Sequence, residues 1–340
     1  MKDIESRLHK DLAGTLGPLP EGAETPLYTL AEIRQRAQVM REGYRAKVVS
    51  VPEVAVTEET ITSGGRDMVI RLYQPAEGER PRTGVLLLHG GGLVYGAPEM
   101  HEETAVQIVQ RTGALVAAPD YALAADAPYP AALRDCYAAL EWLDGHLQGA
   151  GRRLAVMGIS AGGGLAVATA LWARDHQGPR IDFVMPLWPM LDHRADSPSN
   201  QAIQDPRVWN GLTNLHHWQI YLREVMGAVP GYASPAVAET LAGLPSMYIS
   251  LGQLDPFLDE NLAFVSRLSE AGVPVEFHLD PGAYHGFSLL KPQAGLSQRC
   301  YEEWLEALTA VLGDTQKKHI HFRGNSGAVH NCNLASIVLR

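Results

Sequence analysis

The sequence predicts an α/β fold with a mostly parallel, eight-stranded sheet flanked by helices. From about residue 52, short apolar runs alternate with helical patterns, an order typical of strand–helix–strand units. Two segments, 53–61 and 67–75, alternate in polarity and are expected to be antiparallel edge strands. Six further runs are apolar on successive residues, as strands buried on both faces must be: 84–90, 114–121, 153–158, 182–188, 246–252 and 273–279.

Helical patterns fill the intervals between these strands. Apolar residues recur at helical spacing in 102–113, 131–147 and 259–272. The first and last of these segments end in the glycine expected just beyond a helix. A further helix is predicted over 165–175, immediately after a glycine-rich turn.

Two regions lack this alternation of strand and helix patterns, and we expect them to form a cap over the sheet. Residues 1–50 contain an amphipathic helical pattern, and residues 190–230 are rich in Trp, His and Asn without a strand pattern. We therefore assign 51–189 and 231–313 to the sheet domain. The basic, polar stretch 314–340 follows an apparently complete helix and is expected to be a poorly ordered tail.

The charge balance bears on the expected partners and location. Lys and Arg number 28 and Asp and Glu 38, giving a net charge of −10. Such an acidic surface repels phosphate backbones, so nucleic acid is not an expected partner. The N-terminus carries charge throughout, and no apolar run approaches the length that spans a bilayer. The sequence thus predicts a cytoplasmic protein with no membrane partner.

Cysteine and histidine spacing predicts neither a disulfide framework nor a metal site. Cys136, Cys300 and Cys332 are odd in number and widely separated, so we expect reduced structural thiols. His319 and His321 would share one side of a strand, but no third ligand lies nearby and solvated surface is favoured. No metal and no cofactor is expected.

A lone serine stands between a predicted strand and a predicted helix in "GISAG" (158–162). This matches the G-x-S-x-G nucleophile elbow, in which a strained turn lifts a serine hydroxyl clear of the sheet. Alone the pattern is weak, since a turn of small residues packing a helix on a sheet would look similar. Ser160 becomes a candidate nucleophile only if a base, an orienting acid and oxyanion donors accompany it.

Loops after other strands supply these partners. "HGGG" (89–92) follows the first parallel strand, and its bare amides at Gly91 and Gly92, with that of Ala161, are candidate oxyanion donors. His89 is expected to order the loop rather than act as base. His285 directly follows the last strand and is the candidate base, whereas the other histidines, His101, His193, His216 and His217 among them, are expected on the surface or cap.

Asp255 follows the penultimate strand and is the candidate acid. The chain order Ser160, Asp255, His285 is the one used with this elbow. Three other carboxyls compete for the role. Asp259 and Glu260 would begin the next helix, where they complement its dipole, and Asp280 would end a strand.

At this point the sequence resembles the hormone-sensitive-lipase-like branch of the α/β-hydrolases, a family rich in bacterial carboxylesterases. The resemblance runs from about residue 50 to 312 and rests on "HGGG" (89–92), "DYALAADAPYPAAL" (120–133), "GISAGGG" (158–164), "WPMLD" (188–192), "GQLDPFLDE" (252–260) and "PGAYHGF" (281–287). It implies a cofactor-free serine esterase for short- to medium-chain esters, with a cap built from the N-terminus and the segment after the sixth strand. One departure is Ile159, where the family usually has Asp or Thr. The substrate preference and the mode of a homodimer therefore stay open.

The resemblance also leaves rival functions. The same triad would serve on amides, lactones or carbamates. Plant gibberellin receptors resemble this family and have lost the catalytic histidine, so a ligand-binding protein is the other alternative; the presence of His285 favours the enzyme.

Large aromatic groups in the cap and after the sixth strand predict a partly apolar pocket over Ser160. Trp188, Trp209, Tyr28 and Tyr44 are the candidate lining residues. For Trp209, as for Trp218, packing within a small core of the cap itself is the alternative.

Overall fold

The computed structural model describes residues 3–19, 21–46, 51–78, 81–149 and 151–313. The predicted tail at 314–340 lies outside these residues, and Cys332, His319 and His321 lie outside with it. Among the described residues, no helix is long and apolar enough to cross a bilayer.

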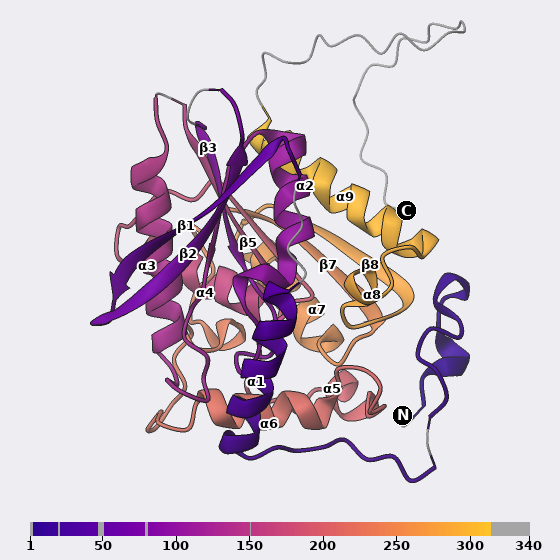
Figure 1. Cartoon of the computed structure of the whole chain (residues 1–340). Coiled ribbons are helices and arrows are strands. Elements are labelled where there is room, and N and C mark those ends of the chain that lie inside the picture. The colour runs from indigo at the N-terminus through magenta and orange to yellow at the C-terminus, as the bar shows by residue number, and fades with distance from the viewer. Residues whose placement is uncertain (1–2, 20, 47–50, 79–80, 150, 314–340) are drawn as a thin grey trace, which may run out of the picture.

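One eight-stranded sheet forms the centre of the molecule, and the prediction of the fold class is confirmed (Figure 1). The spatial order is β1-β2-β4-β3-β5-β6-β7-β8. Only β1 with β2 and β2 with β4 pair antiparallel; every other neighbouring pair is parallel. The strands are β1 (Val54–Ser63), β2 (Arg66–Pro75), β3 (Thr83–Leu88), β4 (Leu115–Pro119), β5 (Arg153–Ile159), β6 (Phe183–Leu187), β7 (Ser246–Leu254) and β8 (Val275–Tyr284).

The central strands are short and buried from end to end. Every residue of β4 and β6 is buried, as is every residue of β3 and β5 except the first. Continuous apolar runs therefore indicated these strands correctly, because parallel strands carry helices on both faces. The edge strand β8 is longer than predicted: it continues through Asp280 to Tyr284, directly before His285.

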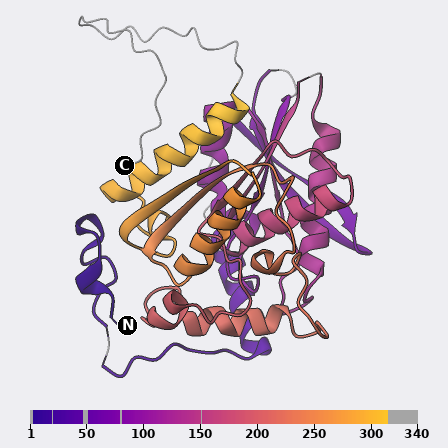
Figure 2. The same cartoon turned by 180° about the vertical axis from the view of Figure 1, so that it is seen from behind.

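Helices cover the two faces of the sheet (Figures 1 and 2). α2 and α9 pack together on one face, and α3, α4 and α7 lie on the other. The bounds are α2 (Glu102–Thr112), α3 (Ala131–His146), α4 (Ala161–Asp175), α7 (Leu258–Glu270), the short α8 (Phe287–Leu290) and α9 (Gly295–Leu312).

α4 begins four residues earlier than predicted, at Ala161 rather than Leu165. Three consecutive glycines, 162–164, form its first turn although glycine is a poor helix former. Their use lies in close packing. A side chain at Gly163 would press on Pro189, and one at Gly164 would collide with the carbonyl oxygen of Met190. The glycines therefore let the start of α4 approach the chain that leaves β6.

Three further helices gather at the carboxyl ends of the parallel strands, at the bottom of Figure 1: α1 (Leu30–Arg45), α5 (Pro198–Ala202) and α6 (Gly211–Tyr221). α1 begins with a capping box between Thr29 and Glu32. Asn210 caps α6, its side-chain oxygen accepting a hydrogen bond from the N–H of Thr213.

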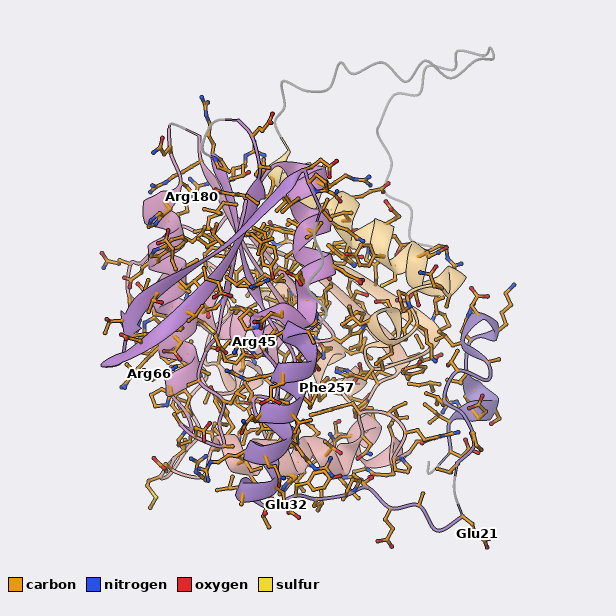
Figure 3. The ribbon with its side chains drawn as sticks, viewed as in Figure 1. Glu21, Glu32, Arg45, Arg66, Arg180 and Phe257 are labelled. Atoms are coloured by element: carbon orange, nitrogen blue, oxygen red, sulfur yellow. The ribbon has the colours of Figure 1, made fainter. Side chains whose placement is uncertain are left out.

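Ion pairs attach α1 to the loops that follow the strands. Arg34 Nε lies 2.7 Å from Asp126 Oδ1, and Arg45 Nε lies 3.0 Å from Glu99 Oε1. Between them, Arg41 Nη1 donates to Asp120 Oδ2 at 2.8 Å. Figure 3 labels Arg45 on α1, in front of the sheet. These pairs specify where the helix sits more than they stabilise it, because partly exposed pairs contribute little energy.

The first residues are attached to the segment before α6. Ile4 is buried, and its N–H donates to Asp205 Oδ2 at 3.1 Å. Arg207 pairs with Asp205 and also reaches Asp3, at 2.8 Å. The two regions that the sequence left outside the strand pattern thus contact each other at the same end of the sheet.

Candidate active site

Ser160 occupies a strained turn between β5 and α4. Its φ of 59° and ψ of −118° are rare for a residue with a side chain. Backbone hydrogen bonds hold the strained conformation. The N–H of Ser160 donates to Leu187 O at 2.8 Å, and Ser160 O accepts from the N–H of Met190 at 3.1 Å. The chain leaving β6 therefore fixes the direction of the hydroxyl.

The glycines on either side of Ser160 are required by neighbouring backbone. A side chain at Gly158 would collide with the carbonyl of Gly162, across the turn. A side chain at Gly162 would collide with the carbonyls of Leu88 and His89, where β3 ends. Glycine at both positions thus brings the serine turn against the loop that follows β3.

Three side chains from three loops form one hydrogen-bond chain. His285 Nε2 lies 2.8 Å from Ser160 Oγ, and His285 Nδ1 lies 2.7 Å from Asp255 Oδ2. Asp255 is fully buried, and Ser160 and His285 are 7% and 8% exposed. Since a carboxylate can only accept, Nδ1 carries the proton, and neutral Nε2 is left to accept from the serine. This is the arrangement in which histidine can take the serine proton.

The buried carboxylate is held from a second side. Asp255 Oδ1 accepts a hydrogen bond from the N–H of Phe257 at 2.9 Å, so both oxygens have donors. The buried side chain of Asp255 therefore has no unsatisfied oxygen.

The competing carboxyls point elsewhere. Asp259 Oδ2 accepts from the N–H of Ser199 at 2.6 Å, which links α7 to α5. Glu260 Oε1 accepts from the N–H of Leu191, and burial raises the pKa of this carboxyl well above its usual value. Asp280 lies within β8, where burial raises its pKa to about 6. None of the three has a hydrogen bond to His285 in the described part of the chain.

The other histidines of the described chain also have separate environments. His101 Nε2 accepts from the N–H of Gly90 at 3.2 Å, and burial lowers its pKa to about 4. His193 contacts Ser234 Oγ at 3.0 Å, and His216 Nε2 contacts Tyr28 O at 2.8 Å. His217 lies in the predicted cap region but faces inward, buried against Gly92.

The loop after β3 presents free amides beside the serine. Gly90 O is paired with His89 Nδ1 at 2.8 Å, and Gly91 O accepts from the N–H of Tyr95 at 2.9 Å. Because N–H and C=O of a trans peptide unit point in opposite directions, the amides of Gly91 and Gly92 face away from these partners. Within the described residues, no hydrogen bond uses the N–H of Gly91, Gly92 or Ala161. Three donors are thus available for an oxyanion.

His89 belongs to the support of this loop, as its place in the sequence predicted. Its ring stacks on Tyr121 with centroids 4.0 Å apart, and the Tyr121 hydroxyl donates to His89 O at 2.7 Å. Burial lowers the pKa of His89 to about 3, so the ring is neutral. The motifs "HGGG" and "DYALA" are therefore parts of one structure, and a neutral His89 orders the glycines.

Aromatic rings surround His285. Trp209 lies 5.9 Å from it between ring centroids, and Trp188 lies 6.5 Å away with its ring nearly perpendicular. Phe257 meets the imidazole edge to face at 5.0 Å, a contact that the sequence analysis missed although Phe257 follows Asp255 by two residues. Figure 3 labels Phe257 above the α5–α6 region. The rings give the histidine an apolar surround.

The remaining predicted pocket residues lie differently. The guanidinium carbon of Arg36 lies 3.7 Å from the centroid of the Tyr28 ring. The carbonyl oxygen of Tyr28 contacts His216. Tyr44 is half-buried on α1. No hydrogen bond or ring contact joins either tyrosine to Ser160, Asp255 or His285 in the described chain. Trp218 packs against Tyr221 and His193, so for this residue the alternative of a local core fits.

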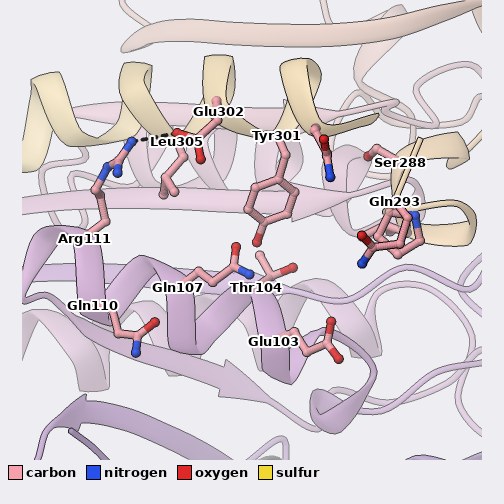
Figure 4. Close-up of a pocket in the computed structure, with 13 residues that line it drawn as sticks. Glu103, Thr104, Gln107, Gln110, Arg111, Ser288, Gln293, Tyr301, Glu302 and Leu305 are labelled. Carbon is pink, nitrogen blue, oxygen red and sulfur yellow. Dashed lines mark hydrogen bonds and ion pairs between the residues drawn. The ribbon is translucent and has the colours of Figure 1, made fainter. Parts of the chain in front are cut away.

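A separate cavity of about 850 Å³ opens between α2 and the α8–α9 region (Figure 4). Polar groups such as Gln107, Tyr301 and the Arg111–Glu302 ion pair line it. Its lining includes none of the three hydrogen-bonded residues of the candidate site. This cavity is therefore separate from the hydrogen-bonded chain of Ser160, His285 and Asp255.

The described residues contain no group of three or more His, Cys, Asp or Glu side chains that could hold a metal ion. Cys136 and Cys300 are buried free thiols, and burial raises the pKa of both. Neither shares a described contact with Ser160 or His285.

The sheet and the site together define a class of protein, a hydrolase of the α/β-hydrolase fold, in which a serine turn, an acid and a histidine follow separate strands, here β5, β7 and β8. A family model described as an alpha/beta hydrolase fold matches residues 85–289. The chain therefore belongs to the α/β-hydrolase family, as its resemblance to the hormone-sensitive-lipase-like branch predicted.

Several known proteins similar to the chain are named esterases. Esterase LipI of Mycobacterium tuberculosis is 35% identical over 252 residues, which is 69% of this chain and 76% of LipI. The solved structure of a bacterial heroin esterase aligns with a TM-score of 0.82 and 31% identity, covering 92% of this chain and all of that one. Brefeldin A esterase, titled a bacterial homologue of human hormone sensitive lipase, shares the fold with a TM-score of 0.75 at 23% identity, covering 90% and 94% of the two chains.

Gly162→Ala tests the close packing of the elbow. The new methyl group would meet the carbonyls of Leu88 and His89, so we expect the free energy of unfolding to fall by about 3 kcal/mol and esterase activity to fall with it. Urea unfolding followed by circular dichroism measures the change.

Gly145→Ala in α3 is the matched control, because no atom lies within 4 Å of a side chain added there. It should be neutral or stabilise by up to about 1 kcal/mol. Equal stability of the two variants would show that the elbow tolerates a side chain and that the packing argument is wrong.

Proposed function

We propose that this protein is a serine carboxylesterase that hydrolyses short- to medium-chain carboxylic esters through an acyl-enzyme intermediate. The observation that carries the proposal is the continuous hydrogen-bond chain from Ser160 Oγ through His285 to Asp255 Oδ2, at 2.8 and 2.7 Å. The names of its relatives, which are esterases, support the same chemistry.

In the first half-reaction, Ser160 Oγ attacks the ester carbonyl carbon while His285 Nε2 accepts the serine proton. The carbonyl π electrons move to oxygen, and the amides of Gly91, Gly92 and Ala161 donate to the resulting oxyanion. The tetrahedral intermediate then collapses and expels the alcohol, which takes the proton from His285. The product of this half is an ester of Ser160 with the substrate's acyl group.

In the second half-reaction, water replaces the alcohol. His285 removes a proton from water as the water oxygen attacks the acyl carbon. The same three amides again donate hydrogen bonds to the oxyanion. Collapse breaks the bond to Ser160 Oγ, which regains its proton from His285. The acid leaves, and the side chains return to their starting state. Asp255 holds the imidazole tautomer in both halves and stabilises its charged form.

The aromatic rings near His285 support a limited substrate size. Three apolar rings lie with their centroids 5.0 to 6.5 Å from that of the imidazole: Trp188, Trp209 and Phe257. Because Trp188 and Phe257 are already fully buried and Trp209 is only partly buried, the chain of a small uncharged ester would pack against Trp209, gaining about 0.8 kcal/mol for each CH₂ group. The proposed partner is thus a small-molecule ester, and a cap made of 1–50 and 190–230 is proposed to close over it. A cytoplasmic location and a homodimer stay predictions.

Ser160→Ala tests the proposed nucleophile. Because only Oγ is removed, the fold should survive while the turnover of p-nitrophenyl butyrate falls by several orders of magnitude. Binding and oxyanion donors alone would leave at most roughly 10³–10⁴-fold acceleration over water. Steady-state kinetics with circular dichroism as a folding control measure this. Turnover like that of the wild type would remove Ser160 from the mechanism.

An acyl-length series tests the proposed substrate class. With p-nitrophenyl esters of graded length, kcat/KM should rise over short chains, as each methylene is buried, and then fall once the apolar surface is filled. Trp209→Ala should move the optimum to longer chains, while Trp218→Ala, in a local core, should lower stability without moving it. A monotonic rise to long-chain substrates contradicts the proposed size limit, and faster cleavage of matched amides contradicts the ester assignment.

A further inference from the structure

We propose that His217, on the cap helix α6, is a positioning residue for the oxyanion loop, holding Gly92 in the conformation that aims its amide at the substrate. The inference rests on the proposed function, because it concerns the donors of the same acyl-transfer site. It assigns a role to a histidine that belongs neither to the triad nor to the loop after β3.

The first observation is the contact itself. A side chain at Gly92 would collide with Nδ1 of His217 on one side and with the ring of Trp209 on the other. Both residues belong to the segment after β6, whereas Gly92 belongs to the loop after β3. The cap segment therefore packs directly on the Cα atom of a proposed oxyanion donor.

The second observation is an unpartnered polar atom at this contact. His217 is 4% exposed, yet its Nδ1 has no hydrogen-bond partner of good geometry among the described residues. Its ring lies edge to face with Trp209, centroids 4.9 Å apart, and with Tyr95 at 5.6 Å. A buried imidazole nitrogen left without a partner is costly, so its position against Gly92 needs an explanation.

The third observation is how the rest of the loop is held. Gly90 O is paired with His89, and Gly91 O accepts from backbone N–H groups of the following turn. Gly92 comes next and has a φ of 63°, in the left-handed region where glycine has wide conformational freedom. Of the three consecutive glycines 90–92, Gly92 alone has no such backbone partner among the described hydrogen bonds, and His217 and Trp209 pack against it.

The charge state of His217 suits a positioning role. Burial, together with the neighbouring His216, lowers the pKa of His217 to about 3, although the backbone of Gly92 acts in the opposite direction. This opposing effect indicates that a ring nitrogen of His217 lies close to the Gly92 backbone without forming a hydrogen bond of good geometry. The ring is thus neutral at working pH, and it neither competes with His285 for protons nor places a positive charge beside the oxyanion.

α6 is placed firmly enough to transmit this contact. Asn210 caps its start, and the carbonyl oxygen of Tyr221 at its end accepts a hydrogen bond from the N–H of Tyr129 at 3.0 Å. A shift of α6 would therefore be felt at Gly92, so the cap and the oxyanion donors are mechanically linked.

The test uses the intact enzyme and three variants. His217→Phe keeps the ring packing but removes the nitrogen, and His217→Asn keeps a side-chain N–H near the position of Nδ1. His216→Phe is the matched control on the same helix, since its partner is Tyr28 and not the oxyanion loop. We measure kcat and KM for p-nitrophenyl butyrate, thermal stability, and inhibition by an alkyl trifluoromethyl ketone. Ser160 Oγ attacks the carbonyl carbon of that ketone. The adduct carries an oxyanion, and the serine proton moves to His285.

His217→Phe should lower kcat on the order of 10-fold, a fraction of the roughly 10²–10³ lost with a whole oxyanion donor. Trifluoromethyl ketone binding should weaken by the same factor while KM stays within about twofold. His217→Asn should restore most of both losses, and His216→Phe should change thermal stability without separating kcat from KM.

Equal losses in the His216 and His217 variants, or unchanged ketone inhibition in His217→Phe, would overturn the inference and leave esterase activity intact. A wild-type enzyme that neither turns over the ester nor binds the ketone would instead overturn the proposed function.

Discussion

The hydrogen bond between Asp255 and His285 is the interaction on which the site depends. It joins the loop after β7 to the loop after β8, and its 2.7 Å length and full burial leave the imidazole one tautomer. Only in that tautomer does Nε2 present a lone pair to Ser160. The other carboxylate oxygen accepts from the N–H of Phe257, so both oxygens of the buried side chain have donors. The candidate base is thus defined by a pair of side chains and not by His285 alone.

The sheet explains why these groups meet. β5, β6, β7 and β8 are parallel neighbours, so their carboxyl ends lie along one edge, and the residues after β5, β7 and β8 face a common space. Close backbone approach then brings the serine turn against the loop after β3. Gly158 and Gly162 allow that approach, and His89 with Tyr121 supports the loop from behind. The strain at Ser160 is held by hydrogen bonds to the chain that leaves β6.

The sequence was informative wherever one strand or one turn decides the outcome. A continuous apolar run such as "GVLLL" predicts a strand that is buried on both faces. Ser160, Asp255 and His285 each stand directly after a strand. The start of α4 was misjudged because Gly162 to Gly164 have low helix propensity, and their close packing depends on distant backbone. The inward direction of His217 and the contact of Phe257 with His285 could not be predicted, since they depend on how α6 and the loop after β7 pack in three dimensions. Charge and periodicity do not encode that packing.

The direct test of this account is the kcat of Asp255→Asn beside that of Asp259→Asn. An amide at position 255 would favour the wrong imidazole tautomer, and the account predicts a loss of kcat on the order of 10⁴-fold with little change in fold. Asp259 accepts a hydrogen bond from Ser199 and lies outside the chain to Ser160, so its variant should keep kcat within a few fold. A mild effect at Asp255 together with a crippling one at Asp259 would contradict the assignment of the acid and the tautomer argument built on it.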